Sequence, residues 1–117
     1  MSNPFTHIEL NTTDVAKAKA FYSELFQWKL EDIPNMPYTM INTGKAPGGG
    51  MTKHPVPGAP SSWMVYVDVD DIVAATAKAK SLGATVMKDV TEVMGMGSLS
   101  VLIDPTGAAI ALWQAKK

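Results

Sequence analysis

The sequence contains no cysteine, which excludes a disulfide framework, a thiolate nucleophile and a thiolate metal ligand. It also has no excess of basic residues. With a formal net charge of -1, neither nucleic acid nor an anionic membrane is an expected partner. Charged residues make up only 18% of the chain and hydrophobic residues 46%, which indicates an ordinary globular protein and not a disordered one.

Long apolar runs are missing as well. The longest apolar stretches are far shorter than a membrane span, and residues 1–10 do not combine a basic segment with an apolar run. We therefore expect neither a membrane span nor a signal peptide, and we expect a cytoplasmic protein. A length of 117 residues predicts a single domain, 1–117.

Two segments of the chain repeat each other. TTDVAKAKAFYSELF (12–26) and VDDIVAATAKAKSLG (69–83) each predict the end of a strand followed by a helix. Their apolar residues recur at the spacing of one helical face, and each residue number rises by 57 between the copies. The matching residues are Val15, Ala18, Tyr22 and Leu25 in the first copy and Ile72, Ala75, Ala79 and Leu82 in the second. Two copies at this spacing indicate a duplicated module.

The residues around these stripes fit the helix assignment. Asp14 and Asp71 each precede a helix, where the macrodipole favours a negative charge. The lysines of AKAKA (16–20) and AKAKS (77–81) are expected to form only the solvated outer stripes of the two helices.

An alternating strand precedes each helix. FTHIELN (5–11) places His7 and Glu9 on one face and aliphatic residues on the other. WMVYVDV (63–69) likewise places Met64 and Tyr66 on one face. We expect the aliphatic faces to cover the helices and the mixed faces to look away from them.

Short strands follow each helix, and turn residues separate them. The predicted strands are 28–33, 38–43 and 48–53 in the first copy, and 85–90, 97–103 and 108–114 in the second. The pattern predicts an α+β fold with two β-α-β-β-β modules, about 4–53 and about 62–115, joined by a linker at about 54–61. We expect the modules to form a curved mixed sheet around a cleft.

This architecture resembles the vicinal oxygen chelate superfamily of glyoxalases, bleomycin resistance proteins and dioxygenases. The similarity lies in HIELNTTDVAKAKAFYSELFQW, WMVYVDVDDIVAATAKAKSLGATV and VLIDPTGAAIALWQ. With the strands between them, these segments cover nearly the whole chain. The resemblance implies that the enzymes of the family hold a divalent metal in the cleft, through His and Glu side chains at four equivalent strand positions.

The resemblance carries over only one of those ligands. His7 stands seven residues before the helix aspartate, where the family has a ligand, but the equivalent residue of the second copy is Met64. Ala111 stands where the family pattern places a carboxylate after Asp-Pro-x-Gly, and the remaining position falls near Gly50. A catalytic zinc-type site needs about three protein ligands with nitrogen, oxygen or thiolate donors. We therefore expect no catalytic metal.

Seven residues are candidates for a ligand pocket that combines an apolar lining with polar tips. They are His7, Glu9, Tyr38, Met40, Met64, Tyr66 and Trp113. His7 and Glu9 share a strand face, so they are either a polar patch, a hydrogen-bonding pair that contacts a ligand, or a general base with an orienting carboxylate. His54, the other histidine, is expected to be a solvated loop residue.

The segment GKAPGGGM (44–51) is not expected to bind nucleotides, because it lacks the Gly-Lys-Ser/Thr ending and no helix follows it. Its glycines more simply permit a bulge or a close backbone approach.

Three functional hypotheses remain. The first is a homodimeric protein that binds a small organic molecule in the cleft without a metal. The second is a metal-dependent lyase, isomerase or dioxygenase with a rearranged ligand set that includes His7, Glu9 or His54. The third is a dimeric accessory module whose cleft is vestigial.

Overall fold

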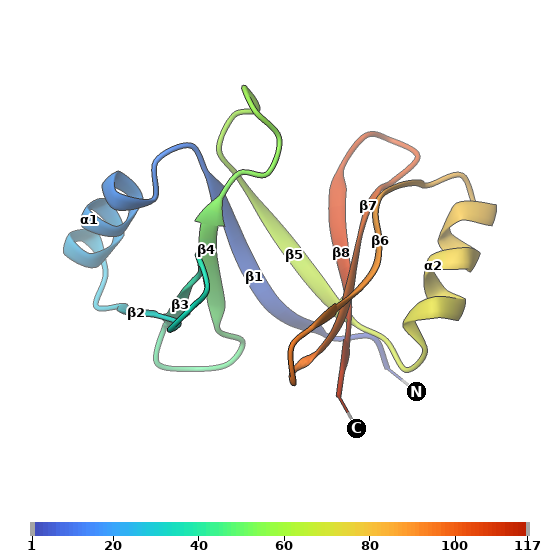
Figure 1. Cartoon of the computed structure of the whole chain (residues 1–117), viewed down its shortest axis with the longest axis horizontal. Helices are drawn as coiled ribbons and strands as arrows, with labels where there is room; N and C mark the ends of the chain where they lie inside the picture. The colour runs from blue at the N-terminus through green and yellow to red at the C-terminus, as the bar shows by residue number, and fades with distance from the viewer. Residues whose placement is uncertain (1, 117) are drawn as a thin grey trace. The chain divides into compact units, whose positions relative to one another are not determined.

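The structure is a computed structural model that describes residues 2–116, and these residues form eight strands and two helices. In chain order the elements are β1 (Phe5–Thr12), α1 (Val15–Leu25), β2 (Lys29–Asp32), β3 (Thr39–Asn42), β4 (Gly49–Lys53), β5 (Ser62–Asp68), α2 (Ile72–Ser81), β6 (Thr85–Val93), β7 (Gly97–Ile103) and β8 (Ala109–Ala115) (Figure 1). Each copy of the repeat thus has the predicted order β-α-β-β-β, and the α+β class is confirmed.

The chain divides into two compact units. The N-terminal unit is residues 7–64, and the C-terminal unit is residues 65–116 together with residues 2–6. The leading residues join the C-terminal unit through the Asp68 N–H, which donates to the Pro4 carbonyl oxygen at 2.9 Å.

The sheet of the N-terminal unit has the order β2-β3-β4-β1. Its β1 and β4 are parallel and its other neighbours are antiparallel, so the sheet is mixed. Leu10, Ile41 and Met51 form its buried core. The residues that pack against this core from α1 and β2 are Val15, Ala18, Tyr22, Trp28 and Leu30. Because Leu10 belongs to this core, the aliphatic face of β1 does face the helix, as alternation predicts.

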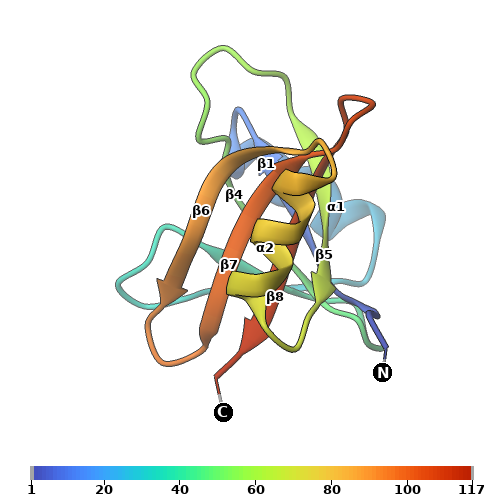
Figure 2. The same cartoon turned by 90° about the vertical axis from the view of Figure 1, so that its right-hand side faces the viewer.

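The C-terminal unit repeats this design with the order β5-β8-β7-β6 and parallel β5 and β8. Figure 2 shows α2 lying over β7 and β8. Ile72 on α2 and Leu102 on β7 are buried, at 3% and 4% exposure. The hydroxyl groups of Thr76 and Ser100 form a buried hydrogen bond of 2.9 Å, so a polar pair joins α2 to β7 within this core.

Both helices begin at the predicted aspartates. The Asp14 carboxylate accepts from the Lys17 N–H at 3.0 Å, and the Asp71 carboxylate accepts from the Ala74 N–H at 3.1 Å. Each side chain satisfies one of the backbone donors that the first turn of a helix leaves without a partner.

The ends of the two apolar stripes are exposed, and one expectation about the helices, that for Lys19, is wrong. The last residue of each apolar stripe is exposed, at 57% for Leu25 and 68% for Leu82, because α1 ends at Leu25 and Leu82 lies beyond the last turn of α2. Lys19 is not a solvated outer residue. Its side chain is 33% exposed and forms an ion pair of 2.8 Å with Asp32. It lies one turn after Val15, so it shares the helix face that packs toward the sheet.

Candidate functional site

Three of the seven predicted pocket residues meet in the N-terminal unit. Alternation along β1 puts His7 and Glu9 on the strand face opposite Leu10, and Tyr38 stands just before β3. The Tyr38 hydroxyl donates to Glu9 Oε1 at 2.9 Å and lies 2.7 Å from His7 Nε2. Glu9 is only 7% exposed. A tyrosine hydroxyl therefore bridges the histidine and the buried carboxylate.

The bridge fixes the protonation of the histidine ring. A phenol has one proton, and here it points to the carboxylate, so its oxygen accepts from His7 and Nε2 must carry hydrogen. Burial lowers the pKa of His7, which favours the neutral ring with its hydrogen on Nε2. The trio thus combines an imidazole, a phenol and a buried carboxylate.

Gly50 makes room for this arrangement. It pairs with Glu9 in the β1–β4 register, and a Cβ atom built at Gly50 would collide with the ring of Tyr38. The neighbouring Gly49 is similarly close to the Ile8 carbonyl oxygen. The prediction that these glycines permit a close approach is confirmed, and at Gly50 the approaching group is an aromatic side chain of the candidate site.

Of the remaining pocket candidates, Met40 shares the sheet face of the trio, because it pairs with Gly50, the partner of Glu9. Met40 is 40% exposed, and Met64 is buried in the N-terminal unit. Tyr66 and Trp113 belong to the C-terminal unit. Tyr66 is buried and pairs with Ala111 on β8. Trp113 is half-buried, and a Cβ atom at Gly97 would lie 2.8 Å from its ring.

His54 is tied to its own loop. The Val56 N–H donates to His54 Nδ1 at 3.0 Å, and the side chain is half-buried. This local hydrogen bond occupies one of the two ring nitrogens that metal ligation would use.

The residues at the family's ligand positions do not fit a divalent metal. His7 Nε2 is engaged with Tyr38, Gly50 has no donor, and the Tyr38 ring takes the space that a side chain at position 50 would need. Met64 offers only a soft thioether and Ala111 nothing. Within residues 2–116, no group of three or more His, Cys, Asp or Glu side chains is placed to hold a metal ion.

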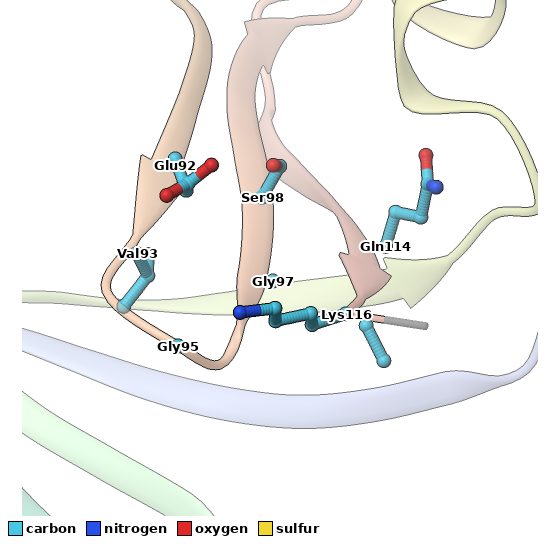
Figure 3. Close-up of a pocket in the computed structure, with 8 residues that line it drawn as sticks. Glu92, Val93, Gly95, Gly97, Ser98, Gln114 and Lys116 are labelled. Carbon is cyan, nitrogen blue, oxygen red and sulfur yellow. The ribbon is translucent and has the colours of Figure 1, made fainter.

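Each unit also contains a cavity. A cavity of about 120 Å³ opens in the C-terminal unit near the β6–β7 turn, where Figure 3 shows Glu92 on β6, Ser98 on β7 and Gln114 on β8. A larger cavity of about 350 Å³ lies in the N-terminal unit between α1 and the sheet. Tyr38 is the one predicted pocket residue along its wall. Lys19 and Lys53 also line it. Sequence reasoning missed these two lysines, although the position of Lys19 one turn after Val15 already pointed inward.

Comparison with known proteins decides the family. The family model described as Glyoxalase/Bleomycin resistance protein/Dioxygenase superfamily matches residues 5–112. The chain belongs to this superfamily. Among curated members, CFP32 of Mycobacterium tuberculosis, named as a candidate glyoxylase, is 36% identical over 94% of this chain and 45% of its own length. The anthracycline biosynthesis protein DnrV of Streptomyces peucetius is 28% identical over 91% of this chain and 45% of its own.

The solved structures agree on the fold. Methylmalonyl-CoA epimerase from Mycobacterium tuberculosis superposes with a TM-score of 0.70 at 14% identity, covering 97% of this chain and 88% of that protein. This likeness concerns the superfamily fold alone. The chain spans about half the length of the curated relatives it matches, 45% for both CFP32 and DnrV. No helix within residues 2–116 is long and apolar enough to cross a membrane.

Proposed function

We propose that this superfamily member binds a small organic molecule, without a catalytic metal, at the sheet face that carries His7, Glu9 and Tyr38. The observation that carries the proposal is the Tyr38 hydroxyl, which bonds to both of the other side chains at 2.7 and 2.9 Å. A phenol held by an imidazole and a carboxylate presents a fixed polar group beside an aromatic ring. Pockets for organic ligands commonly combine such groups.

The same observation opposes metal chemistry at this site. A metal bound to His7 Nε2 would have to displace the Tyr38 hydroxyl, and a carboxylate at position 50 would have to displace its ring. The Tyr38 ring therefore requires glycine at position 50, and it occupies the space that a metal-binding side chain at that position would need. The enzymatic alternative, a metal-dependent lyase, isomerase or dioxygenase, needs ligands that the family pattern does not supply in this chain.

Ligand binding is tested by thermal unfolding with a panel of aromatic compounds. Because DnrV is named for anthracycline biosynthesis, anthracycline-like compounds head the panel. We expect at least one compound to raise the melting temperature and Tyr38→Phe to abolish or strongly reduce that shift. Tyr22→Phe is the matched control, since it removes a hydroxyl from the aromatic cluster of α1 and leaves the trio intact. A shift that survives Tyr38→Phe, or a panel without any response, contradicts the proposal.

Metal content separates this proposal from the enzymatic alternative. We expect protein purified without chelator to contain substoichiometric zinc, nickel, iron and manganese by mass spectrometry. We also expect EDTA to leave its melting temperature unchanged. Stoichiometric metal whose removal abolishes a turnover would establish the enzyme instead.

A further inference from the structure

We propose a second ligand site in the N-terminal unit, in the cavity of about 350 Å³ between α1 and the sheet. It takes a small organic anion with an apolar body, whose charged group lies between Lys19 and Lys53. The site shares Tyr38 with the trio but lies on the helix side of the sheet, because Val15 and Lys19 on α1 line it, whereas His7 and Glu9 do not.

The internal repeat supplies the first argument, because the other copy of the module narrows the same place: its cavity there, lined by Ser98 and Gln114, measures only about 120 Å³. The residue equivalent to Lys19 is Thr76, at the repeat offset. The residue equivalent to Thr39 is Ser100, since Thr39 pairs with Met51 on β4 and Ser100 pairs with Leu112 on β8. Thr76 and Ser100 are 5% and 0% exposed and hydrogen-bond directly.

In the N-terminal unit no such direct bond closes the gap. Lys19 and Thr39 both turn to the Asp32 carboxylate instead, at 2.8 and 2.7 Å. The module therefore folds with this part of the gap closed by two short side chains, but the first copy holds it open around a lysine. A wider opening than the fold requires indicates a use for the space.

The second argument comes from the start of the helix. In the C-terminal unit the Gln114 side-chain oxygen accepts the Ile72 N–H at 2.8 Å and so links β8 to the first turn of α2. The parallel strand pairs make Lys53 the equivalent of Gln114, and Val15 is the equivalent of Ile72. An ammonium group has no acceptor, so Lys53 cannot take over the role of the glutamine. Among residues 2–116, no atom accepts the Val15 N–H.

The charges and the lining define the ligand. Asp32 is already paired with Lys19, and no acidic side chain within residues 2–116 pairs with Lys53. The lining thus carries one excess positive charge, which a single anionic group with several hydrogen-bond acceptor atoms would balance. Val15, Met36 and Pro37 supply apolar surface in the same cavity. Its volume lies near the lower end of small-molecule pockets, roughly 300–1,000 Å³. A monocarboxylate on a single ring or a short alkyl chain meets these conditions.

The test is a titration of the isotopically labelled chain, followed by amide chemical shifts, with benzoate as the probe. We expect saturable shifts at Val15, Lys19, Met36 and Lys53. Benzyl alcohol keeps the ring and lacks the charge, and inorganic phosphate has charge and lacks the ring, so both should bind more weakly than benzoate. Lys53→Gln replaces the lysine by the residue type of its C-terminal equivalent, Gln114. This variant should bind benzoate about fivefold more weakly, or weaker still.

Lys17→Gln is the matched control, because it removes the same charge from an exposed position on α1 that does not line the cavity. It should change benzoate affinity less than about twofold. Dispersed spectra of each variant confirm that it is folded. Three results would overturn the proposal: no saturable shift up to the solubility limit of benzoate, equal losses in the two variants, or phosphate binding as tightly as benzoate.

Discussion

Replacing Gly50 by alanine tests the link between this glycine and the candidate site. The added Cβ would collide with the ring of Tyr38, so the ring must leave its place. That movement breaks the bonds of the Tyr38 hydroxyl to His7 and to the buried Glu9 carboxylate. We therefore expect Gly50→Ala to destabilise the chain, although the change leaves the charge of the protein untouched.

The magnitude follows from three effects. Overpacking costs roughly 1–3 kcal/mol. A buried polar group that loses its partner costs about 1–3 kcal/mol more. Gly50 does not have the left-handed backbone that disfavours alanine, so the lower entropy of the unfolded alanine chain returns about 0.4–1 kcal/mol. The net expectation is a loss of about 2–4 kcal/mol, which is a large share of the stability of a small protein.

A double-mutant cycle with Tyr38→Ala makes the reasoning refutable. Once the ring is gone, Gly50→Ala should become neutral or stabilising by up to about 1 kcal/mol, so the sign of its effect reverses. Urea unfolding followed by tryptophan fluorescence measures each corner of the cycle. Gly48→Ala serves as the control, because its Cβ meets the Ile41 carbonyl oxygen at 3.2 Å and not Tyr38. Its cost should be the same in both backgrounds. A Gly50→Ala cost that does not depend on Tyr38 would refute the argument.

Two further predictions concern buried polar groups. Burial lowers the pKa of His7 below its ordinary value of 6.5. As the pH falls, the unfolded chain therefore binds a proton at this residue before the folded chain does. The free energy of unfolding should thus decrease as the pH drops from 6.5 toward the pKa of the folded state. The His7→Gln variant should show a shallower decline in urea melts across that range, and equal slopes in the two proteins would contradict the prediction. In the C-terminal unit, Thr76→Val should cost about 1–3 kcal/mol because it leaves the fully buried Ser100 hydroxyl without its partner, whereas adding Ser100→Ala should recover much of that loss. Additive losses in the double variant would show that the hydroxyl pair is not the cause.

The sequence by itself determined the repeated fold. The 57-residue offset between Val15 and Ile72, the helix-capping aspartates and the alternating strands all depend on local spacing, which survives in the folded chain. The family likewise follows from local motifs, since the matched region runs from residue 5 to residue 112. The sequence alone also shows that Met64 and Ala111 depart from the family's ligand pattern.

The tertiary structure decided how these residues meet. Alternation placed His7 beside Glu9, but only the pairing of β3 with β4 and of β4 with β1 brings Tyr38 between them and over Gly50. Likewise, the AKAKA segment predicts that Lys19 is exposed to solvent, yet its side chain is half-buried and paired with Asp32. Such contacts join residues far apart in the chain through strand register and side-chain reach. Local periodicity states which face a residue occupies, but it does not state which distant side chain shares that face.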